Sequence, residues 1–218
     1  RVRPGSIFRS ALLSIFTRWT DRLFGLASTV VLARLLAPED FGLVAMAAVF
    51  VGLADVLVDL GVSVAVIHRG HISPPYLNTA WTLRIAQSAV AAAGTLIVAP
   101  WASSYYQNDQ ISSLMSVMAV TMLIGGFENI GIILFQQGMR FDLDFRFFFL
   151  RRIFGFVVTL ILAWALGSFW ALAFGALATR TFGVLLSYIL HEHRPRLTLQ
   201  HAREMLSFSQ WILLSNVG

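Results

Sequence analysis

Ionisable side chains lie inside the most apolar stretches of this 218-residue sequence, where they could bind a charged ligand or one another. Six of them lie near the middle or just past the middle of such stretches: Arg18, Asp21, Arg22, Asp55, Asp59 and Arg180. A charged side chain at the centre of a membrane span costs about 2.5–3.5 kcal/mol, so six facing lipid would cost on the order of 15–20 kcal/mol. The sequence therefore predicts that these side chains face each other, a water-filled cavity or a ligand.

The spacing of these charges predicts shared helix faces. Arg18 and Arg22 are four residues apart, as are Asp55 and Asp59, so each pair lies on one side of a helix. In one interpretation, these arginines and Arg180 simply neutralise the three aspartates as buried ion pairs. In the other, which we favour, they line a polar cavity and offer guanidinium groups to an anionic substrate, because the arginine fork binds phosphate in a bidentate way.

Four further ionisable residues lie nearer the ends of their apolar stretches. Arg84 is an additional candidate for substrate binding. Glu128 follows two glycines, and such a glycine-rich polar patch indicates close helix packing or a kink. Together with the three aspartates, Glu128 is a candidate for ion pairing or for coupling to an ion. Arg84 lies nearer the end of its stretch, and Arg151 and Arg152 lie in the first turns of theirs. Long side chains reach the membrane surface from these positions, so an interfacial role is favoured for all three, with substrate binding as the alternative for Arg84.

The composition supports a membrane environment for these charges. Hydrophobic residues make up 57% of the chain and charged residues 12%, with a mean hydropathy of +0.75. Soluble domains carry about 25% charged residues. The net charge of +5 comes from arginines at span ends or inside apolar stretches, which argues against a nucleic-acid partner. With no cysteine and no motif for a nucleophile, a phosphate-binding loop or a metal, we expect no catalytic residue, no metal and no cofactor, and therefore no enzyme.

Apolar stretches of about 20 residues predict an all-α, polytopic bundle of transmembrane helices. Breakers such as Ala37-Pro38 and Gly167-Ser168 separate six spans, and a seventh begins near Met205. The six predicted spans are Ser10–Leu36, Phe41–Ile67, Asn78–Ala102, Ile111–Gln136, Phe147–Leu166 and Phe169–Leu190.

Arginines in the connections predict the orientation of the chain. Nine of them fall on one side of the predicted membrane, and Arg34 is alone on the other. Because positive loops stay in the cytoplasm, both ends of this chain are expected there. We divide the chain into a six-helix lobe at 1–190, a cytoplasmic linker at 191–204 and the start of a second lobe at 205–218.

Several segments resemble a known family. The run Val31–Gly42, with its Ala-Pro-Glu-Asp turn, resembles the first junction between spans in the polysaccharide transporters. These are the O-antigen and exopolysaccharide flippases of the multidrug/oligosaccharidyl-lipid/polysaccharide exporter superfamily. Weaker matches follow in the family's order at Asp59–Arg69, Leu77–Trp81, Gln136–Phe141 and Gly167–Leu172.

The resemblance implies a two-lobed transporter in a bacterial inner membrane, of which this chain is the N-terminal lobe. Its substrate would be an oligosaccharide linked to a lipid through pyrophosphate, as in lipopolysaccharide and other polysaccharide biosynthesis. Family members carry arginines in the cavity of the first lobe, and Arg18 and Arg22 occupy the matching span. A cation-coupled multidrug exporter of the same superfamily remains an alternative, as does a membrane-embedded glycan polymerase, although the short loops argue against a polymerase.

Overall fold

Helices make up all the regular structure in the described part of the chain. The computed structural model describes residues 25–26, 28–58, 62, 66, 73–138 and 140–206. Helical residues 28–35 precede the elements α2 (Pro38–Val58), α4 (Pro74–Tyr106), α5 (Asp109–Gly126), η1 (Ile130–Ile132), α6 (Ile133–Gln137), α7 (Phe141–Leu166) and α8 (Trp170–Leu190). The predicted all-α class is confirmed.

Four of these helices, α4, α5, α7 and α8, are long and apolar enough to cross a membrane. The helix α2 adds a further apolar segment of 21 residues. The predicted number of six spans stays a prediction, because the structure describes only parts of the first two stretches.

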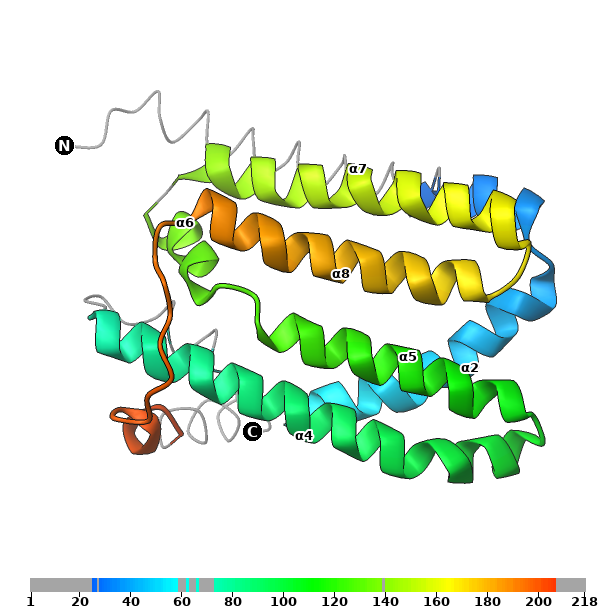
Figure 1. Ribbon diagram of the computed structural model, residues 1–218, viewed down its shortest axis with the longest axis horizontal. Coiled ribbons are helices and arrows are strands. Elements are labelled where there is room, and N and C mark those ends of the chain that lie inside the picture. Colours follow the sequence, from blue (N-terminus) through cyan, green and yellow to red (C-terminus); the bar gives the residue numbers. More distant parts are fainter. Residues whose placement is uncertain are drawn as a thin grey trace, which may run out of the picture.

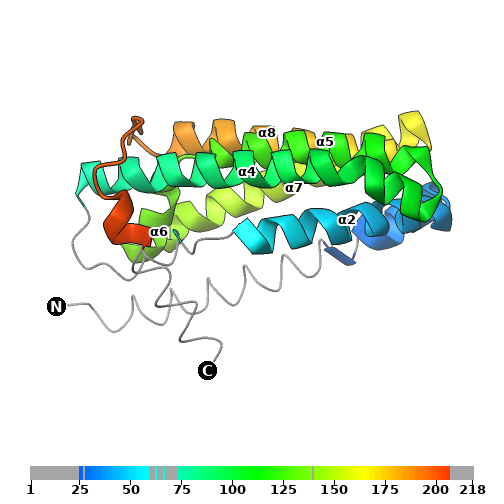
Figure 2. The same ribbon diagram turned by 90° about the horizontal axis from the view of Figure 1, so that it is seen from below.

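The long helices lie side by side and alternate in direction (Figures 1 and 2). The helix α4 packs against α5, α7 packs against α8, and α5 joins the two pairs by packing against α8. The helix α2 packs against α4 and α5. One end of the bundle, the near end, therefore holds the starts of α4 and α7 and the end of α8. The opposite far end holds the α4–α5 and α7–α8 turns (Figure 1).

An acidic side chain joins two turns at the far end. The backbone N–H of Ala37 donates to Asp40 Oδ2 at 3.2 Å, and the N–H of Phe169 donates to Asp40 Oδ1 at 2.9 Å. Asp40 lies in the first turn of α2, where a carboxylate also interacts favourably with the helix dipole. One carboxylate thus fixes the start of α2 and the turn between α7 and α8.

The third predicted span, Asn78–Ala102, is four residues shorter than α4 at each end, and the fourth and fifth predicted spans differ more. The stretch Ile111–Gln136 is not one helix, because α5 ends at Gly126 and the chain resumes as η1 and α6. The side chain of Asn129 accepts a hydrogen bond from the N–H of Gly131 and so caps the new start. The helix α7 begins at Phe141, six residues before the predicted start, because acids in its first turn favour a helix start while lowering the local hydropathy.

The segment after α8 crosses the near end of the bundle and reaches the start of α4 (Figure 1, orange to red). We call residues 191–201 the strap. Backbone N–H groups of the strap donate to α4 side chains, from Arg196 to Asn78 at 3.1 Å and from Thr198 to Thr82 at 3.0 Å. The predicted division into a lobe, a linker and a second lobe is not tested by these contacts and stays a prediction.

Candidate functional site

A cavity of about 1230 Å³ opens between the helices. Its described lining comes from α2, α4, α5, α7 and α8 and from five further residues, Gly25, Ser28, Thr29, Leu32 and Val62. Four arginines line it: Arg84 of α4, Arg151 and Arg152 of α7, and Arg180 of α8. Asp55 of α2 is the single acidic residue among the described lining residues. The described lining therefore carries more positive than negative side chains.

Three of these arginines lie at one level because their helices share a register. Arg84 is ten residues after the start of α4, and Arg151 is ten residues after the start of α7. Arg180 is ten residues before the end of α8. These three helix ends meet at the near end of the bundle, so each arginine lies about 15 Å from that end, at 1.5 Å per residue. Equal distances along the helices bring the three guanidinium groups together.

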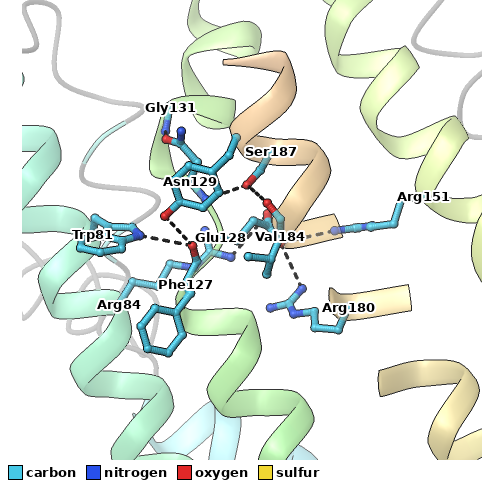
Figure 3. A network of polar contacts seen from close by, with 11 residues as sticks. Trp81, Arg84, Phe127, Glu128, Asn129, Gly131, Arg151, Arg180, Val184 and Ser187 are labelled. Carbon is cyan, nitrogen blue, oxygen red and sulfur yellow. Dashed lines mark hydrogen bonds and ion pairs between the residues drawn. The ribbon is translucent and has the colours of Figure 1, made fainter. Parts of the chain in front are cut away.

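The three arginines converge on Glu128, in the break between α5 and η1 (Figure 3). Its carboxylate oxygens lie 3.7 Å from a guanidinium nitrogen of Arg84, 3.5 Å from Arg151 and 3.4 Å from Arg180. The Glu128 side chain is only 9% exposed. We call these four residues the arginine cluster. Three guanidinium charges against one carboxylate leave two positive charges in the cluster.

The ion pairs leave the carboxylate incompletely satisfied. Glu128 Oε2 is buried and accepts no hydrogen bond within the described part of the chain, although two guanidinium groups lie close to it. Charge-assisted hydrogen bonds are shorter, at about 2.7–2.9 Å, than these contacts. The contacts of Arg84 and Arg180 with Glu128 are therefore longer than charge-assisted hydrogen bonds, so both guanidinium groups can also attract an anion.

Glycines make room for the arginine side chains to cross between helices. The Arg180 guanidinium lies directly against Gly125 of α5, where a Cβ atom would overlap it. A Cβ atom on Gly183 of α8 would lie 2.7 Å from Cδ of Arg151. Any larger residue at either position would force the arginine to move, so these glycines help to set the geometry of the cluster.

Aromatic rings fix one guanidinium group further. The Arg151 guanidinium carbon lies 5.1 Å from the ring centres of both Phe147 and Phe148. A cation over an aromatic face is stabilised by about 0.5–1 kcal/mol at exposed sites and by more when desolvated. The rings and the Gly183 gap together orient Arg151 toward the cavity.

Side chains of α4 and α8 satisfy the backbone where the helix is broken. The carbonyl of Phe127 accepts from Tyr188 Oη at 3.0 Å and from Trp81 Nε1 at 3.5 Å, and the N–H of Asn129 donates to Ser187 Oγ at 3.0 Å (Figure 3). Non-helical backbone at membrane depth is tolerated only where protein buries it or where it lines a water-filled cavity. The break between α5 and η1 is thus stabilised by side chains of neighbouring helices, and it places Glu128 beside the arginines.

The structure brings together three of the predicted site residues, Arg84, Glu128 and Arg180. Asp55 lines the same cavity. The described ion pair of Arg180 is with Glu128, a partner that the sequence did not suggest. The other predicted site residues lie outside the described part of the chain: Arg18, Asp21, Arg22 and Asp59.

Arg151 and Arg152 were not predicted as site residues, yet both line the cavity. The interfacial role favoured for them stays a prediction. The early start of α7 explains why their place in the lining was missed, because both arginines lie almost three turns inside the helix instead of in its first turns. No local signal distinguishes them, since the common register with Arg84 and Arg180 appears only when all three helix ends are known.

Comparison with known proteins places this chain among proteins of polysaccharide biosynthesis. Residues 31–218 match the family model described as "Polysaccharide biosynthesis protein". An uncharacterized membrane protein in the cps region of Klebsiella pneumoniae is 25% identical over 214 residues, which cover 96% of this chain and 44% of that protein. Lipopolysaccharide biosynthesis protein WzxC of Escherichia coli (strain K12) is 25% identical over 203 residues, or 88% of this chain and 40% of the relative. The chain thus spans less than half the length of these curated relatives, and no solved structure matches it.

Proposed function

Because the chain belongs to the polysaccharide biosynthesis protein family, as its sequence motifs predicted, we propose that the intact protein moves a lipid-linked oligosaccharide across a membrane. The observation that carries this proposal is the arginine-lined cavity inside an apolar helical bundle. Buried positive charge of this kind is costly unless it serves an anionic ligand or a pathway through the membrane.

The pyrophosphate that joins lipid and saccharide fits the arginine cluster chemically. Its oxygens can accept hydrogen bonds from several guanidinium forks at once, whereas the single carboxylate of Glu128 cannot satisfy three. The saccharide would occupy the rest of the cavity while the lipid tail stays in the bilayer. A second lobe would complete the cavity, and rocking of the two lobes would expose it alternately to each side of a bacterial inner membrane.

A cation-coupled multidrug exporter fits the cavity less well. An exporter of cationic drugs needs acidic groups to bind its substrate, and the described lining has one aspartate against four arginines. The charge balance therefore supports an anionic substrate. This proposal includes no chemical reaction on the substrate and thus no enzyme activity.

The test is a transport assay on arginine variants of the intact protein. Arg84→Ala and Arg180→Ala each remove one guanidinium while leaving two to neutralise Glu128, so we expect near-normal abundance. Each lost charge-assisted interaction is worth about 1.5–3 kcal/mol, which predicts a ten- to hundredfold loss of transport. The readout is the accumulation of lipid-linked glycan on the cytoplasmic leaflet.

Arg146→Ala is the matched control, because Arg146 is an exposed residue of α7 outside the described cavity lining. It should transport normally. Arg84→Lys should restore transport only in part, since lysine keeps the charge but lacks the fork. Full transport by an Arg84→Ala, Arg180→Ala double variant at normal abundance would refute the proposal.

A further inference from the structure

We infer that Asn129 is a positioning residue for the arginine cluster, because it fixes Glu128 between the arginines by anchoring the helix break to α8 and to the strap. The inference rests on the proposed function in one respect, namely that the cluster binds an anion. Asn129 contacts no arginine of the cluster in the described hydrogen bonds and ion pairs, so its effect on the ligand would pass through Glu128.

Every polar group of Asn129 is used, and the residue is fully buried. Its backbone N–H donates to Ser187 Oγ at 3.0 Å, and its carbonyl accepts from the N–H of Ile132 at 3.2 Å. Its side-chain oxygen accepts from the N–H of Gly131 at 2.9 Å. Its side-chain amide donates to the carbonyl of His193, in the strap, at 2.7 Å. These four bonds tie the break to α8, to η1 and to the strap.

The hydrogen bonds of Asn129 set the position of the neighbouring Glu128. The backbone N–H of Glu128 donates to the carbonyl of Gly125 at 3.3 Å, so the residue is held by the end of α5 on one side and by Asn129 on the other. A glutamate fixed in this way keeps its carboxylate at the point where the three guanidinium groups converge. Its negative charge then competes with an arriving anion and repels it.

The part of the strap to which Asn129 is bonded is itself held by further hydrogen bonds. The N–H of His193 donates to Nδ1 of His191 at 3.0 Å. Farther along the strap, the N–H of Thr198 donates to the hydroxyl of Thr82 in α4, two residues before Arg84. The amide of Asn129 is therefore bonded to a fixed point, and its loss would leave Glu128 free to swing away when an anion binds.

Binding of farnesyl diphosphate, a short polyprenyl pyrophosphate, to the intact protein in detergent at low ionic strength tests the inference. Glu128→Gln removes the competing charge and should tighten binding by about ten- to a hundredfold. Asn129→Ala should also tighten it, by about threefold or more. In the double variant the affinity should equal that of Glu128→Gln alone, because Asn129 acts through Glu128.

Asn108→Ala is the matched control. The side-chain oxygen of Asn108 accepts from the N–H of Gln110 at 2.9 Å, as that of Asn129 accepts from the N–H two residues later, but Asn108 lies at the opposite end of α5. Its replacement should leave binding unchanged. A purely structural role for Asn129 predicts the opposite sign, with lower abundance and weaker binding. If Asn129→Ala does not fold, Ser187→Ala removes another bond of the same anchor and should tighten binding in the same way.

The outcomes separate this inference from the proposed function. Weakened or unchanged binding in folded Asn129→Ala and Ser187→Ala, or effects that add to that of Glu128→Gln, would overturn the inference alone. No binding by the wild type and Glu128→Gln alike, or binding that Arg180→Ala leaves intact, would overturn the proposed function and the inference with it.

Discussion

Replacing Gly183 with alanine should disturb the arginine cluster without removing any charge. The added Cβ would lie 2.7 Å from Cδ of Arg151, and an ordinary carbon contact is about 3.5–4.0 Å, so the side chain must retreat by about 1 Å. The ion pair between Arg151 and Glu128, now 3.5 Å long, would lengthen to about 4.5 Å.

The electrostatic cost follows from these distances. At an effective dielectric constant of about 20, lengthening one ion pair from 3.5 to about 4.5 Å costs roughly 1 kcal/mol, which is about a sixfold change in an equilibrium constant. A glycine-to-alanine change in a helix normally stabilises it by about 0.5–1 kcal/mol. The two effects oppose each other in stability, so Gly183→Ala should change the melting temperature little. Because Arg151 would retreat from a bound anion by the same distance, transport should fall by about sixfold.

The assay compares thermal unfolding and transport of Gly183→Ala with those of Gly94→Ala in the intact protein. Gly94 of α4 has no neighbouring atom within 4 Å of an added Cβ, so its replacement should be neutral to slightly stabilising and fully active. Equal activity of the two variants at equal abundance would show that the Gly183 gap does not position Arg151.

Further predictions concern the two ends of the bundle. Asp40→Ala removes the acceptor for two backbone N–H groups and should lower the free energy of unfolding by about 1–2 kcal/mol, whereas its exposed neighbour Glu39→Ala should change it by less than about 0.5 kcal/mol in the same melts. Burial lowers the pKa of His193 below its usual 6.5, so the folded strap favours the neutral imidazole. The strap is therefore most stable above pH 6.5 and loses stability as the pH falls from there through the lowered pKa. Hydrogen exchange in the strap, corrected for intrinsic rates, should be faster at pH 5 than at pH 7.5, and equal rates would contradict this. Reporter fusions after Arg140 and at Ser168 should report cytoplasm and periplasm respectively, and the reverse result would overturn the predicted orientation.

The sequence predicted the helical class and some helix ends well. The sixth predicted span, Phe169–Leu190, agrees with α8 to within one residue, because a Gly-Ser turn precedes it and a polar segment follows it. The sequence did not predict that the helix is interrupted after α5, because Phe127 and the residues of η1 are apolar and keep the hydropathy continuous. Glycine-rich sequence around Glu128 did indicate a kink or close packing, which is the signal that pointed there.

Charge and hydropathy could identify candidate site residues but not their partners. Arg84, Glu128 and Arg180 stood out as charges in apolar stretches. Their convergence depends on which helices are neighbours and on how far each helix extends, and no local pattern encodes either. Asn129 was equally hidden, because a buried asparagine is recognised as an anchor only when its hydrogen-bond partners from α8 and the strap are known.

The common register of the arginine cluster limits how this protein can change in length. One residue inserted between the start of α4 and Arg84 would turn that side chain by about 100° and move it by 1.5 Å along the helix, away from the cavity. The same holds between the start of α7 and Arg151, and between Arg180 and the end of α8. Insertions at the far-end turns, near Gln107 and Ser168, lie beyond all three arginines and leave their register unchanged. Length variation among relatives should therefore be found at the far-end turns, while these three ten-residue segments keep a constant length.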